Sequence, residues 1–159
     1  MAFIDRDTDG TGTLTFYNVS QAVGGGCPNW LEDVKVVQFF LQRIYSKPKY
    51  LPFKPWGDMS VDGKVGPITK AWITKYQLDC RNHGVNTAVD GIIDKAGNDE
   101  SNYKSSMSHT WYTIRILNNM MFENDTAVYK TLSTNPEVPP DLRLIFLQMQ
   151  AEGPSMVFE

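Results

Sequence analysis

Three aspartates near the start of the chain have a spacing that could bind a calcium ion. Asp5, Asp7 and Asp9 alternate with other residues and are followed by Gly10. Calcium-binding loops open in this way, because alternate carboxylates converge on a hard cation and the glycine allows a sharp turn. The twelfth position of such a loop normally holds a bidentate glutamate, but Phe16 stands there. We therefore expect no cofactor apart from a possible calcium ion, and the alternative is a solvated acidic turn before a short strand.

A second candidate for metal chemistry is His83, which is followed by Asp90 in a His-x6-Asp spacing. Zinc peptidases that cut D-alanyl peptides have a similar stretch. Catalytic zinc needs three protein ligands and an open position. The other histidine, His109, stands in a Met-Ser-His-Thr context that does not match the second histidine ligand of those enzymes. Since most carboxylates lie in predicted turns and helix caps, we expect neither a zinc centre nor an enzyme.

Residues 61–77 predict a tight turn that leads into a helix. Asp62-Gly63 is a turn pair, because aspartate bonds its own backbone and glycine accepts a positive φ. Gly66 breaks the chain again, and Pro67 suits the first helical position, where its missing N–H costs nothing. An apolar face at helical spacing then follows. It consists of Ile68, Ala71, Trp72 and Tyr76.

This stretch resembles a known module. Its pattern, Val-Asp-Gly-x-x-Gly-Pro-x-Thr-x-x-Ala ending in Tyr-Gln, is similar to the central repeat of the peptidoglycan-binding-like domain, a three-helix unit found beside many bacterial and phage cell-wall hydrolases. Residues 33–41 resemble the first helix of that family, and residues 89–93 resemble the start of a second turn repeat. At residues 94–96, Asp-Lys-Ala stands where Gly-Pro and Thr are expected. The residues that carry the fold motif are Gln38, Asp62, Gly63, Gly66, Pro67 and Thr69.

The resemblance implies non-catalytic binding of peptidoglycan or its stem peptides, which would anchor a wall-associated assembly or a partner hydrolase. The groove is expected near the first Asp-Gly turn and the adjoining helix ends. Candidate ligand contacts are Trp56, Asp62, Lys64, Trp72 and Gln77. The alternative is a protein–protein interaction module on the same scaffold, such as an adaptor, an immunity protein or a component of a secretion or phage apparatus. An exposed apolar patch would favour that alternative.

The predicted fold is mainly α, with a three-helix bundle and two Asp-Gly turns. Residues 1–28 form a β-prone extension with a glycine-rich hinge at Gly24 to Gly26, residues 29–122 form the peptidoglycan-binding-like domain, and residues 123–159 add a C-terminal helix. Asn29 and Glu32 predict a capping box at the start of the first helix. Ser108 or Thr110 is expected to cap the third helix, and Gly153-Pro154 to end the last one.

Residues 47–57 contain three prolines and cannot form helix interior. The aromatic residues of this extended loop are Tyr50, Phe53 and Trp56. Their rings are flat and apolar, so they could stack on sugar faces or cover the hydrophobic core. The sequence leaves both interpretations open.

Composition restricts the classes of partner. The chain has 159 residues and a net charge of −3, which argues against non-specific nucleic-acid binding and against a polybasic membrane surface. Cys27 and Cys80 are expected to be buried free thiols, with a disulfide as the alternative. The N-terminus has no Sec signal pattern, so we expect synthesis in the cytoplasm and delivery to the periplasm or cell wall by a non-Sec route.

Overall fold

The regular structure of the chain is mainly helical. The computed structural model describes residues 3–6, 15–47, 51, 53–97 and 110–156, and it describes side chains within these ranges from residue 16 to residue 148. The helices are α1 (Leu31–Ser46), α2 (Pro67–Asn82), α3 (Thr113–Asn124), α4 (Thr126–Lys130) and α5 (Pro140–Met156). Two antiparallel strand pairs accompany them: β1 (Phe3–Arg6) with β2 (Thr15–Asn18), and β3 (Val23–Gly24) with β4 (Ile92–Ile93). The predicted mainly α fold class is confirmed at this level.

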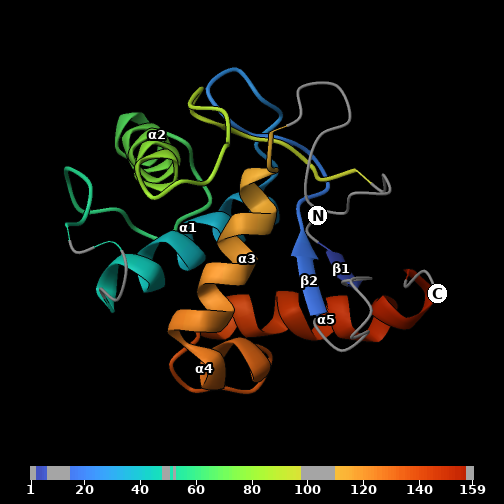
Figure 1. The fold of residues 1–159 in the computed structure, drawn as a ribbon. Coiled ribbons are helices and arrows are strands. Elements are labelled where there is room, and N and C mark those ends of the chain that lie inside the picture. The colour runs from blue at the N-terminus through green and yellow to red at the C-terminus, as the bar shows by residue number, and fades with distance from the viewer. Residues whose placement is uncertain (1–2, 7–14, 48–50, 52, 98–109, 157–159) are drawn as a thin grey trace.

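Helix α1 is the central element. It packs against α2, α3 and α5, and α5 also packs along β1. Figure 1 shows α3 between α2 on one side and the β1–β2 hairpin on the other, with α5 crossing below them. In the described part of the chain, no helix combines the length and the apolar character that crossing a bilayer requires.

One continuous core joins the two ends of the chain to the central helices. One apolar stripe of α1, at helical spacing, is fully buried, and it consists of Val34, Val37, Phe40, Leu41 and Ile44. The ring of Phe40 stacks on Phe146 of α5 at 6.3 Å between centroids, and Tyr17 of β2 meets Phe146 edge-on at 5.1 Å. Aromatic pairs in these geometries stabilise a core beyond their burial alone. Residues of the predicted N-terminal and C-terminal extensions therefore share the core of the central helices.

The predicted capping box of α1 is wrong. Trp30 is the N-cap residue and makes no side-chain cap hydrogen bond. Asn29 instead brackets Gly24: its Oδ1 accepts from the Gly24 N–H at 2.7 Å and its Nδ2 donates to the Gly24 carbonyl at 2.8 Å. The side chain is committed to a neighbouring loop because Asn29 has a positive φ of 51° that turns it away from the helix end.

The limits of α3 and α5 also differ from the prediction. Helix α3 begins after Tyr112, so Thr110 is not its cap, and Ser108 lies outside the described residues. Helix α5 continues through Gly153 to Met156 instead of ending at the Gly-Pro pair. A glycine inside a helix costs about 1 kcal/mol and a proline about 3 kcal/mol, so helix propensity alone does not account for this extension.

Gly24 belongs to a strand and is not part of a hinge. It pairs with Ile92 across β3 and β4, and its φ is 145°. A Cβ built at this position would lie 2.4 Å from the Gly91 carbonyl oxygen. The glycine is therefore required by close backbone contact with the second Asp-Gly turn.

The proline-rich loop separates its buried residues from its aromatic ones. Leu51, Pro55 and Met59 are buried, whereas Phe53 is 77% exposed and Trp56 is 73% exposed. The interpretation that the aromatic rings cover the core is therefore wrong for these two. Tyr50 lies outside the described residues.

The predicted calcium loop is described only in part. Asp5 lies in β1 opposite Phe16 of β2, whereas Asp7 and Asp9 lie outside the described residues. Among the residues that the structure does describe, no group of three or more His, Cys, Asp or Glu residues could hold a metal ion. Both cysteines are free thiols: Cys80 is buried, and Cys27 is half-buried.

Candidate functional site

A buried glutamine organises the first Asp-Gly turn. The Gln38 Oε1 accepts hydrogen bonds from the N–H groups of Asp62 at 3.1 Å and Gly63 at 2.9 Å. Its Nε2 donates to Asp62 Oδ1, to the Lys64 carbonyl and to Thr69 Oγ1, at 3.0 to 3.1 Å. The Asp62 carboxylate also accepts from the Lys64 N–H, and this bond is the main reason that its pKa is lowered. We call these five residues the first turn clasp.

The same set of contacts recurs at the second Asp-Gly turn. The Gln77 Oε1 accepts from the N–H groups of Asp90 at 3.1 Å and Gly91 at 2.9 Å. Its Nε2 donates to Asp90 Oδ1 at 3.3 Å, to the Ile92 carbonyl at 2.9 Å and to Thr113 Oγ1 at 3.1 Å. Asp90 Oδ1 accepts from the Ile92 N–H, as Asp62 does from Lys64. These five residues form the second turn clasp.

The threonine that the second repeat lacks in sequence is supplied by the next helix. Thr69 is the third residue of α2, and Thr113 is the first residue of α3. Each accepts a hydrogen bond from the glutamine of the preceding helix. The replacement of Gly-Pro and Thr by residues 94–96 therefore leaves the second turn clasp complete, because a longer connection returns a threonine to the same place.

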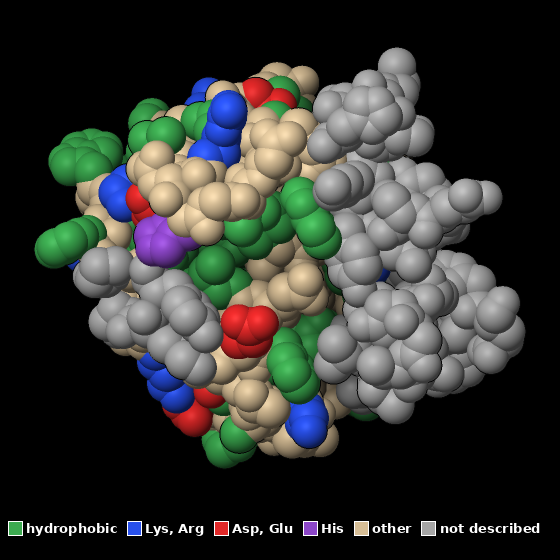
Figure 2. Space-filling view, viewed as in Figure 1, with side chains coloured by type: hydrophobic (Ala, Val, Ile, Leu, Met, Phe, Trp, Pro, Cys, Tyr) green, Lys and Arg blue, Asp and Glu red, His purple; other side chains and the backbone are tan. Residues whose placement is uncertain are grey.

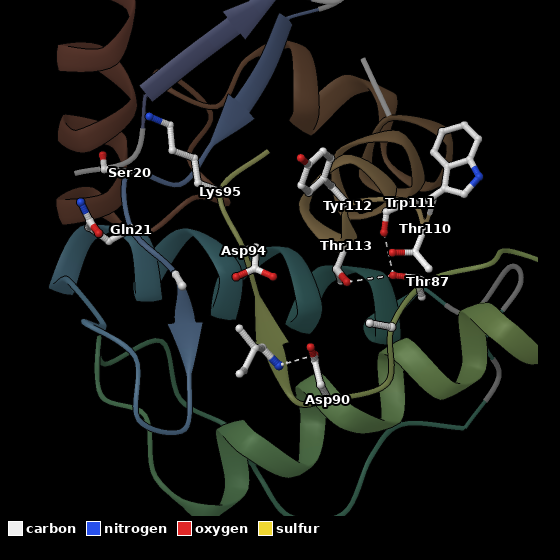
Figure 3. A pocket seen from close by; sticks show the side chains of 13 residues that line it. Ser20, Gln21, Thr87, Asp90, Asp94, Lys95, Thr110, Trp111, Tyr112 and Thr113 are labelled. Carbon is white, nitrogen blue, oxygen red and sulfur yellow. Dashed lines mark hydrogen bonds between the residues drawn. The ribbon is translucent and has the colours of Figure 1, made fainter. Parts of the chain in front are cut away.

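A pocket of about 710 Å³ opens beside the second turn clasp. Figure 3 shows Ser20, Gln21 and Lys95 on one side of it and Thr87, Thr110 and Trp111 on the other. The pocket, which we call the second-turn pocket, is lined by Ser20, Gln21, Ala22, Thr87, Ala88, Asp90, Ile92, Asp94, Lys95, Thr110, Trp111, Tyr112 and Thr113. Its volume lies within the range of small-molecule sites.

Buried polar side chains hold the N-terminal wall of this pocket. The buried Asp33 carboxylate accepts from the Ser20 N–H at 3.0 Å and from the Gln21 N–H at 3.1 Å. Asn18 bonds both the N–H and the carbonyl of Ala96 at 3.1 Å, which fixes the chain directly after Lys95. Buried groups that are fully hydrogen-bonded make a site rigid.

The opposite wall is fixed by a bridge between the loop after α2 and the start of α3. The Trp111 N–H donates to the Asn86 carbonyl at 2.8 Å, and Thr87 Oγ1 donates to the Trp111 carbonyl at 2.9 Å. The hydroxyl groups of Thr87 and Thr113 are 3.1 Å apart, which connects this wall to the second turn clasp. The pocket is therefore formed before any ligand arrives.

Two carboxylates give the second-turn pocket its electrostatic character. Partial burial of the Asp94 carboxyl group raises its pKa, and the neighbouring Asp90 carboxylate raises it further. The thiol of Cys27 is affected by the same charges, because burial first and then Asp94 and Asp90 raise its pKa. A cation in the pocket would reduce the repulsion that these shifts report.

The predicted ligand contacts are divided between the surface and the interior. Asp62 and Lys64 are exposed, and they line a separate hollow of about 280 Å³ at the first turn. Trp72 is buried, and its indole N–H donates to the carbonyls of Trp56 and Gly57. Gln77 is fully buried within the second turn clasp.

Sequence reasoning did not select the residues of the larger pocket. The sequence identifies Asp90 and Gly91 as part of a turn repeat, but it shows Asp94 only as a departure from the motif. One feature of the sequence could have indicated this pocket: the second Asp-Gly pair is followed by Asp94, a carboxylate four residues after Asp90.

The described residues do not assemble the predicted alternatives for catalysis. His83 is exposed at the end of α2, with its Nδ1 2.9 Å from the Asp79 carbonyl oxygen. Asp90 is committed to the second turn clasp, and His109 lies outside the described residues.

No protein-family model, curated protein or solved structure matches the chain.

Proposed function

We propose that this chain binds bacterial peptidoglycan or its stem peptides without cleaving them, and that the second-turn pocket is its main binding site. Two arguments support the proposal. Residues 33–41 and 61–77 resemble the peptidoglycan-binding-like domain in sequence. The two turn clasps also hold both Asp-Gly turns with the same set of hydrogen bonds, including the one from glutamine to threonine. On this proposal, α1, α2 and α3 with their two turns are the three-helix binding module.

The observation that carries the proposal is the mixed chemistry of one preformed pocket. Asp90 and Asp94 place two carboxylates in it, Lys95 adds a cation, and Trp111 and Tyr112 add aromatic rings. Stem peptides carry both amino and carboxylate groups, and they are joined to sugars with apolar faces. A pocket that has both signs of charge beside aromatic rings suits such a ligand better than it suits a nucleic acid or a purely apolar molecule.

The hydrogen bonding of the pocket carboxylates supports the proposal of binding without hydrolysis. A glycosidase needs two carboxyl groups that are free to act as acid and base or nucleophile. Asp90 Oδ1 instead receives hydrogen bonds from Gln77 and from the Ile92 N–H, and its role is to hold the turn. Asp94, whose carboxylate is not part of the turn clasp, is the carboxylate that we expect to contact the ligand.

The test is sedimentation of the purified protein with insoluble peptidoglycan sacculi. We expect wild type to pellet with sacculi, and Asp94→Asn to bind about tenfold more weakly, because one charge-assisted hydrogen bond is lost. Asp62→Asn, at the hollow of the first turn, is the matched control and should lose less. A soluble stem peptide should compete for the pocket. Wild type that stays in the supernatant at low and moderate salt would refute the proposal.

A further inference from the structure

The carboxylate of Asp94 has no counter-charge in the second-turn pocket. Within the described part of the chain, it accepts no hydrogen bond and forms no ion pair. Partial burial and then the Asp90 carboxylate raise its pKa, and no cation among the described residues offsets that repulsion. Figure 3 shows the Asp94 carboxylate above Asp90, whereas the Lys95 side chain extends away from both, toward the side of Ser20. The pocket therefore holds a negative charge that the described residues do not neutralise.

The small number of carboxylates indicates which kind of cation fits this pocket. A calcium ion takes six to eight oxygen ligands. Among the residues that the structure describes, no three or more of His, Cys, Asp and Glu are grouped so that they could hold a metal ion. Asp90 Oδ1 is also occupied by the Ile92 N–H and the Gln77 amide. An ammonium group donates only three hydrogen bonds, so one carboxylate and neutral acceptors are enough for it.

Neutral acceptors and aromatic rings line the same pocket. Gln21, Thr110 and Tyr112 contribute side chains that carry oxygen, and Trp111 contributes an indole ring. The face of an aromatic ring attracts a cation that lies within about 6 Å of its centre. The pocket volume of about 710 Å³ is also far larger than a lone ammonium ion, so the cationic group belongs to a larger molecule.

We propose that Asp94 binds the free ammonium group of a stem peptide that is not cross-linked. This inference rests on the proposed function and names the part of the wall that the second-turn pocket binds. The diamino acid of a stem peptide has a side-chain amine that is positively charged at neutral pH. Cross-linking converts this amine into an uncharged amide, and a neutral N–H bonds a carboxylate about half as strongly as an ammonium group does. The chain therefore prefers wall material that has few cross-links.

The experiment is sedimentation with three preparations of sacculi. One is untreated, one is acetylated with acetic anhydride, which removes the charge of free amines, and one is reductively dimethylated, which adds bulk but keeps the charge. We expect wild type to bind acetylated sacculi about tenfold more weakly than untreated ones, and dimethylated sacculi within about threefold. Asp94→Asn should bind all three preparations alike, because its coupling to the amine is already lost.

Glu123→Gln is the matched control, because it removes one negative charge from an exposed position of α3 outside the second-turn pocket. It should respond to acetylation as wild type does. Circular dichroism verifies that each variant is folded. Soluble competitors identify the source of the amine. Nα-acetyl-L-alanyl-γ-D-glutamyl-L-lysine should displace wild type from untreated sacculi, and its Nε-acetyl form and glucosamine should each be about tenfold less effective.

The outcomes separate this inference from the proposed function. If wild type binds acetylated and untreated sacculi equally, the inference is wrong and the proposed function stands. If acetylation weakens Asp94→Asn as much as wild type, the ammonium group is bound elsewhere. Competition by glucosamine that equals that of the peptide would place the amine on the sugar and overturn the assignment to the stem peptide. Wild type that pellets with none of the preparations would refute both proposals.

Discussion

Replacing Gln77 tests whether the second turn clasp holds the pocket in place. In Gln77→Ala, the buried N–H of Gly91, the N–H of Asp90 and the carbonyl of Ile92 all lose their partner. Each buried polar group left unpaired costs about 1 to 3 kcal/mol, and two of these three groups are only partly buried. We therefore expect a loss of about 3 to 5 kcal/mol in the free energy of unfolding, a large share of the stability of a typical domain.

The assay is urea unfolding followed by circular dichroism at 222 nm, with Gln148→Ala on the exposed face of α5 as the control. The control should stay within about 0.5 kcal/mol of wild type. If Gln77→Ala costs less than about 1 kcal/mol, the hydrogen bonds of the clasp do not stabilise the fold as the burial of Gln77 implies.

Gln77→Glu adds a test by pH. One carboxylate oxygen can still accept from the two turn N–H groups, but the other would face the Ile92 carbonyl and Asp90 Oδ1, where the amide nitrogen now donates. This repulsion raises the pKa of the new glutamate in the folded state above its unfolded value of about 4.3. The folded state then binds the proton more tightly, so stability is retained below about pH 4 and lost as pH rises through the folded pKa.

The remaining predictions concern the walls of the pocket. Asp33→Ala should lower the free energy of unfolding by about 2 to 4 kcal/mol in urea titrations, because the N–H groups of Ser20 and Gln21 lose their acceptor; a loss below about 1 kcal/mol would contradict this. Gly24→Ala should destabilise strongly, by about 2 kcal/mol or more, since its Cβ would lie 2.4 Å from the Gly91 oxygen, whereas Gly25→Ala has only the flexible Lys70 side chain at 3.4 Å and should be nearly neutral. Because burial and Asp90 raise the pKa of Asp94, its charged form is disfavoured on folding, so Asp94→Asn should raise the melting temperature at pH 7 and leave it unchanged at pH 3; equal shifts at both pH values would show that ionisation is not the cause.

The parts of the fold that sequence predicts are those set by local periodicity. The apolar stripe of α1 and the Asp62-Gly63 turn before Pro67 follow from residues that are neighbours along one helix or one turn. The structure bears out both, because such patterns leave few alternatives for burial.

The parts that sequence does not predict depend on long-range hydrogen bonds. Gln38 lies 24 residues before its aspartate and Gln77 only 13 before its own, so spacing does not reveal that they are equivalent. Thr113 reaches the second turn from 36 residues beyond Gln77. The sequence does not tell whether a glutamine on a helix binds a ligand or a turn of its own chain. The burial of Gln38 and Gln77 in the structure distinguishes the two roles.

Helix α2 contributes to both turn clasps, and its two contributions differ. Thr69 near its start completes one clasp, and Gln77, eight residues later, begins the next, so a single helix receives from its predecessor and donates to its successor. A helix with a threonine near its start and a glutamine eight residues later could in principle be repeated along a chain. Helix α3 ends the series: eight residues after Thr113 stands the buried Met121, and Asn118 bonds the backbone of Tyr17 instead. In the part of the chain that the structure describes, the polar contact of α3 is therefore made with the N-terminal strand β2, and the series of clasps ends at α3.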